Sequence, residues 1–178
     1  MTAPAGPQDD QSPRLNVSTW RDPRVFIATG FASGFLRPAP GTWGSLAALA
    51  VWWLLLSGAA WPVQIAAVVL TAVLGTWLVA AVDRRYGVHD DPAIVVDEFA
   101  GLWLALLAAP AGPTWMLAGF VLFRVFDVAK PWPIGWADRR VPGALGVMLD
   151  DLFAGVLTAV VLQSAFLLMH WSAAPLSP

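Results

Sequence analysis

The sequence predicts an all-α membrane protein, a polytopic helical bundle with about five spanning helices and a short N-terminal re-entrant or interfacial helix. Of its 178 residues, 58% are hydrophobic and 12% are charged, whereas about a quarter of the residues of a soluble domain are charged. The mean hydropathy is +0.65, and apolar stretches recur from residue 44 onward. Eleven tryptophans agree with this prediction, because indole rings favour the membrane–water interface.

The N-terminal segment, residues 1–24, is rich in Pro, Asp, Gln, Ser and Thr and lacks the apolar core of a signal peptide. We predict a flexible tail there, followed by one membrane-embedded catalytic domain over residues 25–178. Removing residues 1–20 should then leave turnover nearly intact. The stretch Val25–Leu36 is too short and too rich in glycine to span a bilayer, so it is the predicted re-entrant or interfacial helix.

Five longer apolar stretches follow, and breaks that contain proline or glycine separate them. The second stretch carries no charged residue and has the length of about 20 residues that a bilayer requires. Residues 110–113 predict a tight turn between the third and fourth stretches, and residues 131–143 predict a long loop before the fifth. The predicted spans are Gly44–Trp61, Val63–Val82, Ala93–Ala109, Thr114–Lys130 and Gly146–His170.

The basic residues give these spans one orientation. They precede the first span, follow the second and follow the fourth, whereas the loops after the first and third spans contain no Lys or Arg. Positive residues mark the cytoplasmic side of a membrane protein. The sequence therefore predicts a multi-pass membrane protein, with its N-terminus in the cytoplasm and its C-terminus outside.

Carboxylates lie at three of the cytoplasmic span ends. Asp97 and Glu98 open the third span, Asp127 closes the fourth, and Asp150 and Asp151 open the fifth. Ionisable residues inside spans are costly and usually face the bundle interior, where they pair or bind something. The predicted orientation brings all five to a similar depth, which indicates a polar site at the inner leaflet.

Clustered carboxylates need cations. Arg124 and Lys130 flank Asp127 at spacings of three residues and can supply some of that charge. A divalent metal would neutralise the rest, and oxygen ligands in a chain without cysteine favour Mg²⁺ or Mn²⁺. Magnesium often completes its coordination with a substrate phosphate. We therefore predict phosphoryl chemistry with Mg²⁺ as cofactor, the five carboxylates as metal ligands and catalytic residues, and Arg124 and Lys130 as phosphate contacts.

The segment "RPAPGTWGS", from Arg37 to Ser45, adds a weaker signal. Its glycines permit close backbone approach to a ligand, and Thr42 and Ser45 offer hydroxyl groups, so the segment could hold phosphate at a helix N-terminus. The simpler interpretation is a helix start capped by Thr42 or Ser45.

Simpler interpretations also exist for the charged residues. Both acidic pairs could complement helix dipoles, Asp127 could form an ion pair with Arg124, and Lys130 could anchor the topology. His89 and the run Asp138–Arg140 fit solvated loops.

An alternative function is a cation-coupled transporter, since intramembrane carboxylates are typical of ion paths. Against it, the carboxylates share one depth and the outer half of every predicted span lacks charge.

Four stretches together resemble the phosphatidylglycerophosphatase A family: "FASGFLRPAPGTWGS", "IVVDEFAG", "FRVFDVAKPWPI" and "GVMLDDLFAG". Their order and spacing also match, over about residues 25 to 165. One departure is in the first stretch, where we would expect Ser-Pro-Lys-Ala-Pro. This chain places its basic residue one position earlier, as Arg37. If that residue contacts substrate phosphate, Arg37 must reach it from a shifted position.

The resemblance implies a magnesium-dependent lipid phosphatase of the bacterial inner membrane that converts phosphatidylglycerol phosphate to phosphatidylglycerol. It also implies an all-helical fold with a central helix surrounded by others. The family's acidic positions fall on the same five carboxylates, and its basic positions fall on Arg124 and Lys130.

The expected partners are the membrane and an anionic phospholipid substrate, while a net charge of −2 gives no reason to expect nucleic acid. The nucleophile is either water or an aspartate that becomes phosphorylated, and we favour water.

Overall fold

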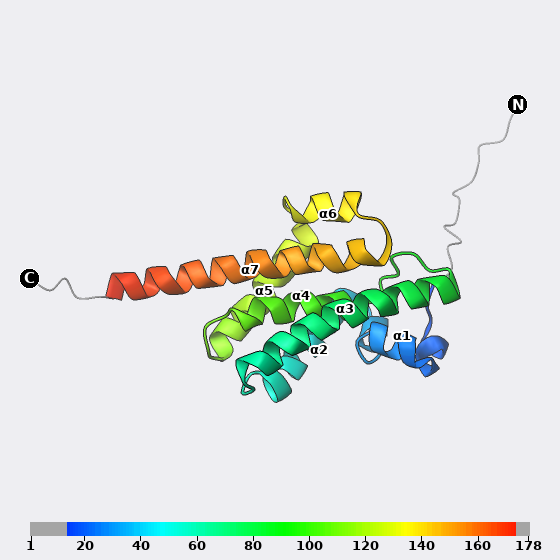
Figure 1. Ribbon diagram of the computed structural model, residues 1–178, viewed down its shortest axis with the longest axis horizontal. Helices are drawn as coiled ribbons and strands as arrows, with labels where there is room; N and C mark the ends of the chain where they lie inside the picture. Colours follow the sequence, from blue (N-terminus) through cyan, green and yellow to red (C-terminus); the bar gives the residue numbers. More distant parts are fainter. Residues whose placement is uncertain (1–13, 174–178) are drawn as a thin grey trace, which may run out of the picture.

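The structure is a computed structural model that describes residues 14–173, and every regular element in this range is helical (Figure 1). This confirms the all-α prediction. In chain order the elements are η1 (Val17–Arg21), α1 (Pro23–Ala28), η2 (Ser33–Phe35), α2 (Pro40–Val51), the π-helical turn η3 (Trp52–Leu56), α3 (Trp61–Tyr86), α4 (Val96–Leu107), α5 (Pro113–Ala129), α6 (Ile134–Arg140) and α7 (Gly143–Ala173).

Helix α4 occupies the centre of the bundle. It contacts α2, α3, α5 and α7 (Figure 1), and its residues Phe99, Ala100, Leu102 and Ala105 are buried. A helix that is apolar on all sides belongs in the core of a bundle. Its first turn carries Asp97 and Glu98, so the core helix brings two carboxylates into the interior.

Proline and glycine define several helix ends, as the sequence predicts. Pro40 and Pro113 occupy the first turns of α2 and α5, where the missing N–H of proline costs no helical hydrogen bond. Gly87 ends α3 with a positive φ of 65°, a conformation that glycine adopts without strain. The expected caps of α2 are absent, because its N-cap residue is Ala39 and no side chain caps it.

Only two helices within residues 14–173 are long and apolar enough to cross a membrane, α3 and the Gly143–Trp171 part of α7. The prediction of five spans is therefore not confirmed. Helix α4 has 12 residues and a length of about 18 Å, which is shorter than the hydrocarbon core of about 30 Å. The predicted third span is shortened because the N–H of Val95 donates to the carbonyl of Ala28 instead of continuing a helix.

Two further predicted segments differ from the structure. The expected helix over Val25–Leu36 is divided into α1 and η2 by a turn, and the expected loop over residues 131–143 contains α6. Residues 1–13 of the predicted tail lie outside the described residues. In the remainder of the tail, Leu15 is buried and its N–H donates to a carboxylate oxygen of Asp91 at 2.7 Å. Removing residues 1–20 would break this contact.

Helices α4 and α7 run in parallel and meet through glycine. A Cβ atom at Gly101 would lie 2.4 Å from the carbonyl oxygen of Asp151, and one at Gly155 would lie 2.3 Å from the carbonyl oxygen of Gly101. Both distances are shorter than any normal van der Waals contact, so the backbones can approach this closely only without side chains. Asp97 and Asp151 lie one turn before these glycines, and the contact brings them together.

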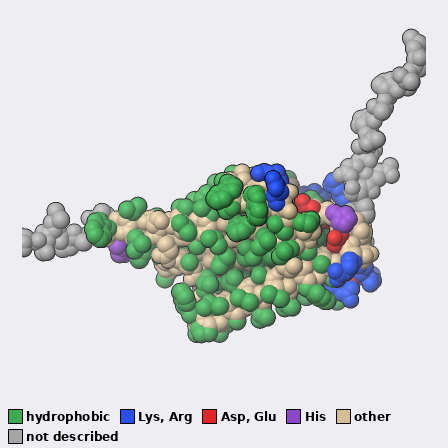
Figure 2. All heavy atoms as spheres, turned by 45° about the horizontal axis from the view of Figure 1, so that its top comes forward, with side chains coloured by type: hydrophobic (Ala, Val, Ile, Leu, Met, Phe, Trp, Pro, Cys, Tyr) green, Lys and Arg blue, Asp and Glu red, His purple; other side chains and the backbone are tan. Residues whose placement is uncertain are grey.

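The charged side chains gather at one end of the molecule. In Figure 2, most of the Lys, Arg, Asp and Glu side chains lie toward the end nearest the N-terminus, one basic group lies on the upper edge nearer the middle, and hydrophobic side chains predominate over the rest of the visible face. Large apolar side chains of α3 and α7, such as Leu70 and Val160, are more than half exposed. The polar end is therefore where the acidic residues of α4 and α7 are found.

Candidate active site

Three carboxylates form the centre of the site. Asp97, Glu98 and Asp151 each have an oxygen within 4.8 Å of the others. Glu98 and Asp151 are buried, with 7% and 3% of their surfaces exposed. One oxygen of each, Glu98 Oε2 and Asp151 Oδ2, is buried without a hydrogen-bond partner among the described residues. Buried carboxylates without partners are costly, so this geometry is that of a cation site.

The other two predicted ligands are bonded to basic side chains. Arg124 donates to Asp127 Oδ2 at 2.5 Å and lies 3.8 Å from Glu98 Oε1. Lys130 donates to Asp150 Oδ2 at 2.8 Å. The ion pair of Asp127 with Arg124, one of the simpler interpretations, is therefore present. Because Arg124 also approaches Glu98, this pair belongs to the same cluster.

The helix-dipole interpretation applies to only one of the two acidic pairs. Asp97 and Glu98 lie in the first turn of α4. Asp150 and Asp151 lie about two turns after the start of α7 at Gly143, beyond the range in which a helix terminus acts on a charge. Each pair has the same local geometry, because the second N–H donates to the first carboxylate at 3.1 Å.

Lys130 is held between two carboxylates. It follows the last residue of α5 in a left-handed conformation, with a φ of 45°, and donates to both Asp138 and Asp150. Burial opposes the charge, but these two hydrogen bonds raise the pKa of Lys130 above its ordinary value. The two hydrogen bonds therefore favour the charged ammonium form beside the carboxylate cluster.

All five predicted carboxylates line one cavity of about 510 Å³. Lys130 also lines it, as do Pro40 and Gly41 at the start of α2. The acidic side chains around it far outnumber the basic ones; they are Asp83, Asp90, Asp91, Asp97, Glu98, Asp127, Asp138, Asp150 and Asp151. An anionic ligand could enter such a cavity only together with additional positive charge.

The first turn of α2 approaches this cluster closely. A Cβ atom at Gly41 would lie 2.5 Å from Glu98 Oε1 and 3.1 Å from the guanidinium nitrogens of Arg124. The absence of a side chain therefore keeps open the space between the start of α2 and the cluster. Pro40 has no N–H group, and the N–H groups of Thr42 and Trp43 donate to the carbonyl of Ala39. What this helix start offers a phosphate group is therefore the positive end of its dipole.

Of the other predicted phosphate contacts, the structure brings only Ser45 close to the cluster. The buried hydroxyl of Ser45 donates to the carbonyl of Gly41 at 2.8 Å and lies 3.5 Å from Arg124. Thr42 is half-buried and lies outside the cavity lining. Arg37 is exposed and is likewise absent from the lining. Ser45 and Arg124 are also absent from the lining, but Arg124 contacts Glu98 and Asp127 of the cluster and Ser45 contacts Arg124. Ser45 therefore supports Arg124, whereas no such contact brings Thr42 or Arg37 to the site.

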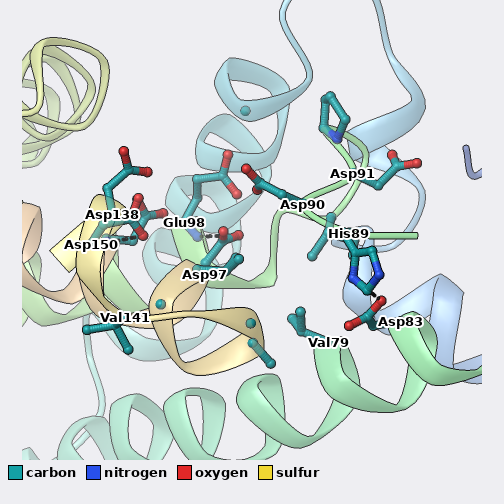
Figure 3. Close-up of a pocket in the computed structure, with 18 of the residues that line it drawn as sticks. Val79, Asp83, His89, Asp90, Asp91, Asp97, Glu98, Asp138, Val141 and Asp150 are labelled. Atoms are coloured by element: carbon teal, nitrogen blue, oxygen red, sulfur yellow. Dashed lines mark hydrogen bonds and ion pairs between the residues drawn. The ribbon is translucent and has the colours of Figure 1, made fainter. Parts of the chain in front are cut away.

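One wall of the cavity comes from the loop after α3. Figure 3 shows His89 beside Asp83, with Asp90 and Asp91 on the same side of the cavity. The Nδ1 atom of His89 lies 2.8 Å from Asp83 Oδ1. The carboxylate of Asp91 accepts the N–H groups of Leu15 and Ala93, which fixes the loop just before α4. His89 thus contributes to the cavity wall, although the sequence alone assigned it to a loop.

Asp138 is the residue that sequence reasoning missed. Asp138 is exposed, as expected together with Arg139 and Arg140, but it lies in a helix instead of a loop, and this helix, α6, packs on α7 through buried Ile134 and Ala137. This packing places Asp138 against Lys130. The sequence did contain a signal for this helix, because Ile134 and Ala137 are apolar and lie three residues apart, as on one face of a helix.

Comparisons with known proteins show the family to which the chain belongs. The family model described as Phosphatidylglycerophosphatase A matches residues 26–166. A phosphatidylglycerophosphatase A of Escherichia coli (strain K12) is 42% identical to this chain over 165 residues, which cover 92% of each protein. The chain belongs to the phosphatidylglycerophosphatase A family. It is therefore a phosphatase, as the resemblance implied.

Two other relatives show the breadth of similarity. A phosphatidylglycerophosphatase A of Haemophilus influenzae (strain ATCC 51907 / DSM 11121 / KW20 / Rd) is 38% identical over 84% of this chain and 91% of the relative. A protein of Bacteroides thetaiotaomicron (strain ATCC 29148 / DSM 2079 / JCM 5827 / CCUG 10774 / NCTC 10582 / VPI-5482 / E50), named a putative phosphatidylinositol-3-phosphatase, is 39% identical over 79% of this chain and 92% of the relative. No solved structure matches the chain significantly. The name of the Bacteroides relative concerns a different lipid headgroup, so family membership alone leaves the substrate to be argued.

Proposed function

We propose that this phosphatase removes the terminal phosphate of phosphatidylglycerol phosphate, giving phosphatidylglycerol and inorganic phosphate in a magnesium-dependent reaction at the cytoplasmic leaflet. The observation that carries the proposal is the cluster of Asp97, Glu98 and Asp151 in a cavity shared with Lys130. The substrate is taken from the names of the Escherichia coli and Haemophilus relatives.

Magnesium fits the residues that are present. Asp97, Glu98 and Asp151 offer only oxygen ligands, which Mg²⁺ prefers, and two of these oxygens, on Glu98 and Asp151, are buried without a partner. These three residues would hold the ion, with Asp127 and Asp150 beside them. When bound, it would neutralise the carboxylates and stabilise the charge on the phosphate oxygens during transfer.

The basic side chains of the chain would bind and orient the phosphate. Arg124 lies between Glu98 and Asp127, and its planar guanidinium can contact two oxygens of a phosphate group. Lys130 supplies a second positive charge, held by Asp138 and Asp150. The first turn of α2 at Gly41 adds the positive end of a helix dipole.

The nucleophile in this proposal is water. Its oxygen forms the new bond to phosphorus, and the ester bond between phosphorus and the glycerol oxygen breaks. A carboxylate of the cluster accepts the proton lost by the water and passes it to the leaving alkoxide. The carboxylates are more useful as ligands than as nucleophiles, because they are clustered and oriented by backbone N–H groups. A phosphorylated aspartate trapped by acid quench would overturn this choice.

The membrane placement is part of the proposal. α3 and α7 have the length and composition to cross the bacterial inner membrane, and the C-terminal end of α3 lies beside the cavity. Arg84 and Arg85 at that end, like Arg139 and Arg140 at the end of α6, suit the cytoplasmic side by the positive-inside rule. The substrate would then reach the cavity from the inner leaflet.

Polar contacts far from the cavity favour a phosphatase over a transporter. Gln64 donates to the carbonyl of Leu56, and Gln163 donates to the carbonyl of Ala108. The hydroxyl of Thr158 donates to Ala154 within α7. These polar side chains satisfy nearby backbone groups, so they do not extend the acidic cavity into an ion path.

The test is a substrate panel in detergent micelles with Mg²⁺ present. We expect phosphate release from phosphatidylglycerol phosphate to exceed release from phosphatidate and from phosphatidylinositol 3-phosphate. Asp127→Asn serves as the blank for contaminating phosphatases. Faster release from either comparison lipid would overturn the substrate assignment, and equal release by the variant would overturn the site.

A further inference from the structure

A second polar region lies outside the acidic cavity, where α1 packs against the end of α3. Arg24, Arg84 and Arg85 line a hollow of about 290 Å³ together with Trp77 and Ala81. We call these five residues the arginine cradle. None of them lines the acidic cavity, so the mechanism above does not use them.

The cradle is positive because most of its charge is not neutralised. Arg85 pairs with Asp22, with Nε 3.2 Å from the carboxylate. Arg24 and Arg84 form no ion pair within residues 14–173. Three guanidinium groups with one neighbouring carboxylate leave a net positive charge, which favours an anion.

Asp22 fixes the shape of the cradle. Its carboxylate accepts the backbone N–H of Arg24 at 2.9 Å and the hydroxyl of Tyr86 at 3.1 Å. The hydrogen bond from Arg24 lowers the pKa of Asp22 below its ordinary value against the effect of burial, and Tyr86 and Arg85 lower it further. The Arg85 guanidinium also lies 5.7 Å from the centre of the Tyr86 ring. The start of α1 is thereby joined to the end of α3.

An apolar stripe runs from the cradle along the outer face of α3. Val69, Val73 and Trp77 follow one another at intervals of four residues and are each more than half exposed. Arg84 and Arg85 follow about two turns after Trp77, beyond the buried Ala81. Leu70 and Leu74 widen the stripe. Arg84 lies about 10 Å beyond Trp77 along the helix axis, the order in which a phospholipid presents acyl chains, interface and phosphate.

We propose that the arginine cradle is a second lipid site, which binds the headgroup phosphate of an anionic phospholipid while its acyl chains lie on the stripe of α3. Guanidinium groups match phosphate oxygens in geometry and charge, and Trp77, which lies before the arginines along the axis of α3, suits the membrane interface. This site rests on the proposed membrane placement and is independent of the ester that the enzyme hydrolyses. It would retain anionic lipid at the end of the molecule where the active site opens.

The test is native mass spectrometry of the full chain in detergent with added dioleoyl phosphatidylglycerol or dioleoyl phosphatidylcholine. The test variant is Arg24→Gln/Arg84→Gln, which leaves the Asp22–Arg85 pair intact. The matched control is Arg139→Gln/Arg140→Gln, which removes two arginines from the end of α6. We expect the test variant to lose one bound phosphatidylglycerol, with affinity lower by on the order of tenfold, and the control to retain it.

Two further measurements test whether positive charge in the cradle is responsible for lipid binding. Arg24→Lys/Arg84→Lys should recover part of the binding, and retention of phosphatidylglycerol by the unmodified chain should fall at high salt while that of phosphatidylcholine does not. Equal binding of both lipids by the unmodified chain, or unchanged phosphatidylglycerol binding by the Gln variant, would overturn the proposal. Phosphate release is measured separately, so failure of the active-site proposal would be seen there and not in lipid retention.

Discussion

Gly101 of α4 and Gly155 of α7 pack backbone against backbone, and a Cβ atom at Gly155 would lie 2.3 Å from the Gly101 carbonyl oxygen. One turn earlier on each helix are Asp97 and Asp151, two members of the carboxylate cluster. The spacing of this cluster is therefore set by glycines that themselves carry no chemistry.

A side chain at this contact should damage both the fold and the site. Gly101→Ala should lower the free energy of unfolding by roughly 1–3 kcal/mol, because an added Cβ forces the helices apart. Phosphate release should fall as well, since Asp97 and Asp151 separate. Thermal unfolding and activity in the same detergent would show both effects. Gly58→Ala is the control, because a Cβ there meets nothing within 4 Å; equal stability of the two variants would contradict the packing argument.

Neutralising a carboxylate of the site should abolish turnover without loss of the fold. We expect Asp97→Asn, Asp127→Asn and Asp150→Asn each to lower kcat by at least about a hundredfold, since each removes charge that the transition state requires. Size-exclusion elution should stay unchanged. The matched control is Asp90→Asn, which lines the same cavity but lies outside the cluster. Full activity of Asp127→Asn would remove a central part of the site.

Asp138 should act through Lys130. Asp138→Asn keeps the shape of the side chain but weakens its hold on the ammonium group, so KM should rise on the order of tenfold if Lys130 binds phosphate. Asp138→Glu should recover part of the loss. The control is Asp83→Asn, at the other wall of the cavity. If Asp138→Asn left KM unchanged, the assignment of Lys130 to the phosphate would be wrong.

The start of α2 offers a direct comparison of two adjacent residues. Gly41→Ala places a Cβ 2.5 Å from Glu98 Oε1 and should reduce phosphate release strongly, because it fills the space beside the cluster. Thr42→Ala should stay near the unmodified rate, since Thr42 does not line the cavity. A large loss with Thr42→Ala would instead favour the hydroxyl contact predicted from the sequence.

The carboxylates were predictable because charge stands out in apolar sequence. Ionisable residues within such stretches have few roles other than a site, and the structure brings Asp97, Glu98, Asp127, Asp150 and Asp151 to one cavity. Their division into a cluster of three and two ion pairs depends on side-chain packing between α4, α5 and α7. The periodicity of apolar residues in the sequence does not show which of the five carboxylates form the cluster and which form ion pairs.

The number of spans was not predictable from hydropathy, because a buried core helix and a membrane span have the same composition. Helix α4 is apolar owing to its central position, and its start at Val96 depends on the hydrogen bond from Val95 to Ala28, which is distant in sequence. Sequence alone was also insufficient to place Arg37 and Thr42, which we had predicted as phosphate contacts. Their residue types suit phosphate, but the direction of the chain before α2 places them away from the cavity.

The most direct test of the central claim is phosphate release from phosphatidylglycerol phosphate by the unmodified chain and by Asp151→Asn, each with Mg²⁺ and with EDTA. The account predicts release by the unmodified chain that stops with EDTA, returns when Mg²⁺ is added in excess, and is absent from folded Asp151→Asn under both conditions. Release that persists in EDTA, or that survives in Asp151→Asn, would contradict the claim that the buried carboxylates hold the ion on which the reaction depends.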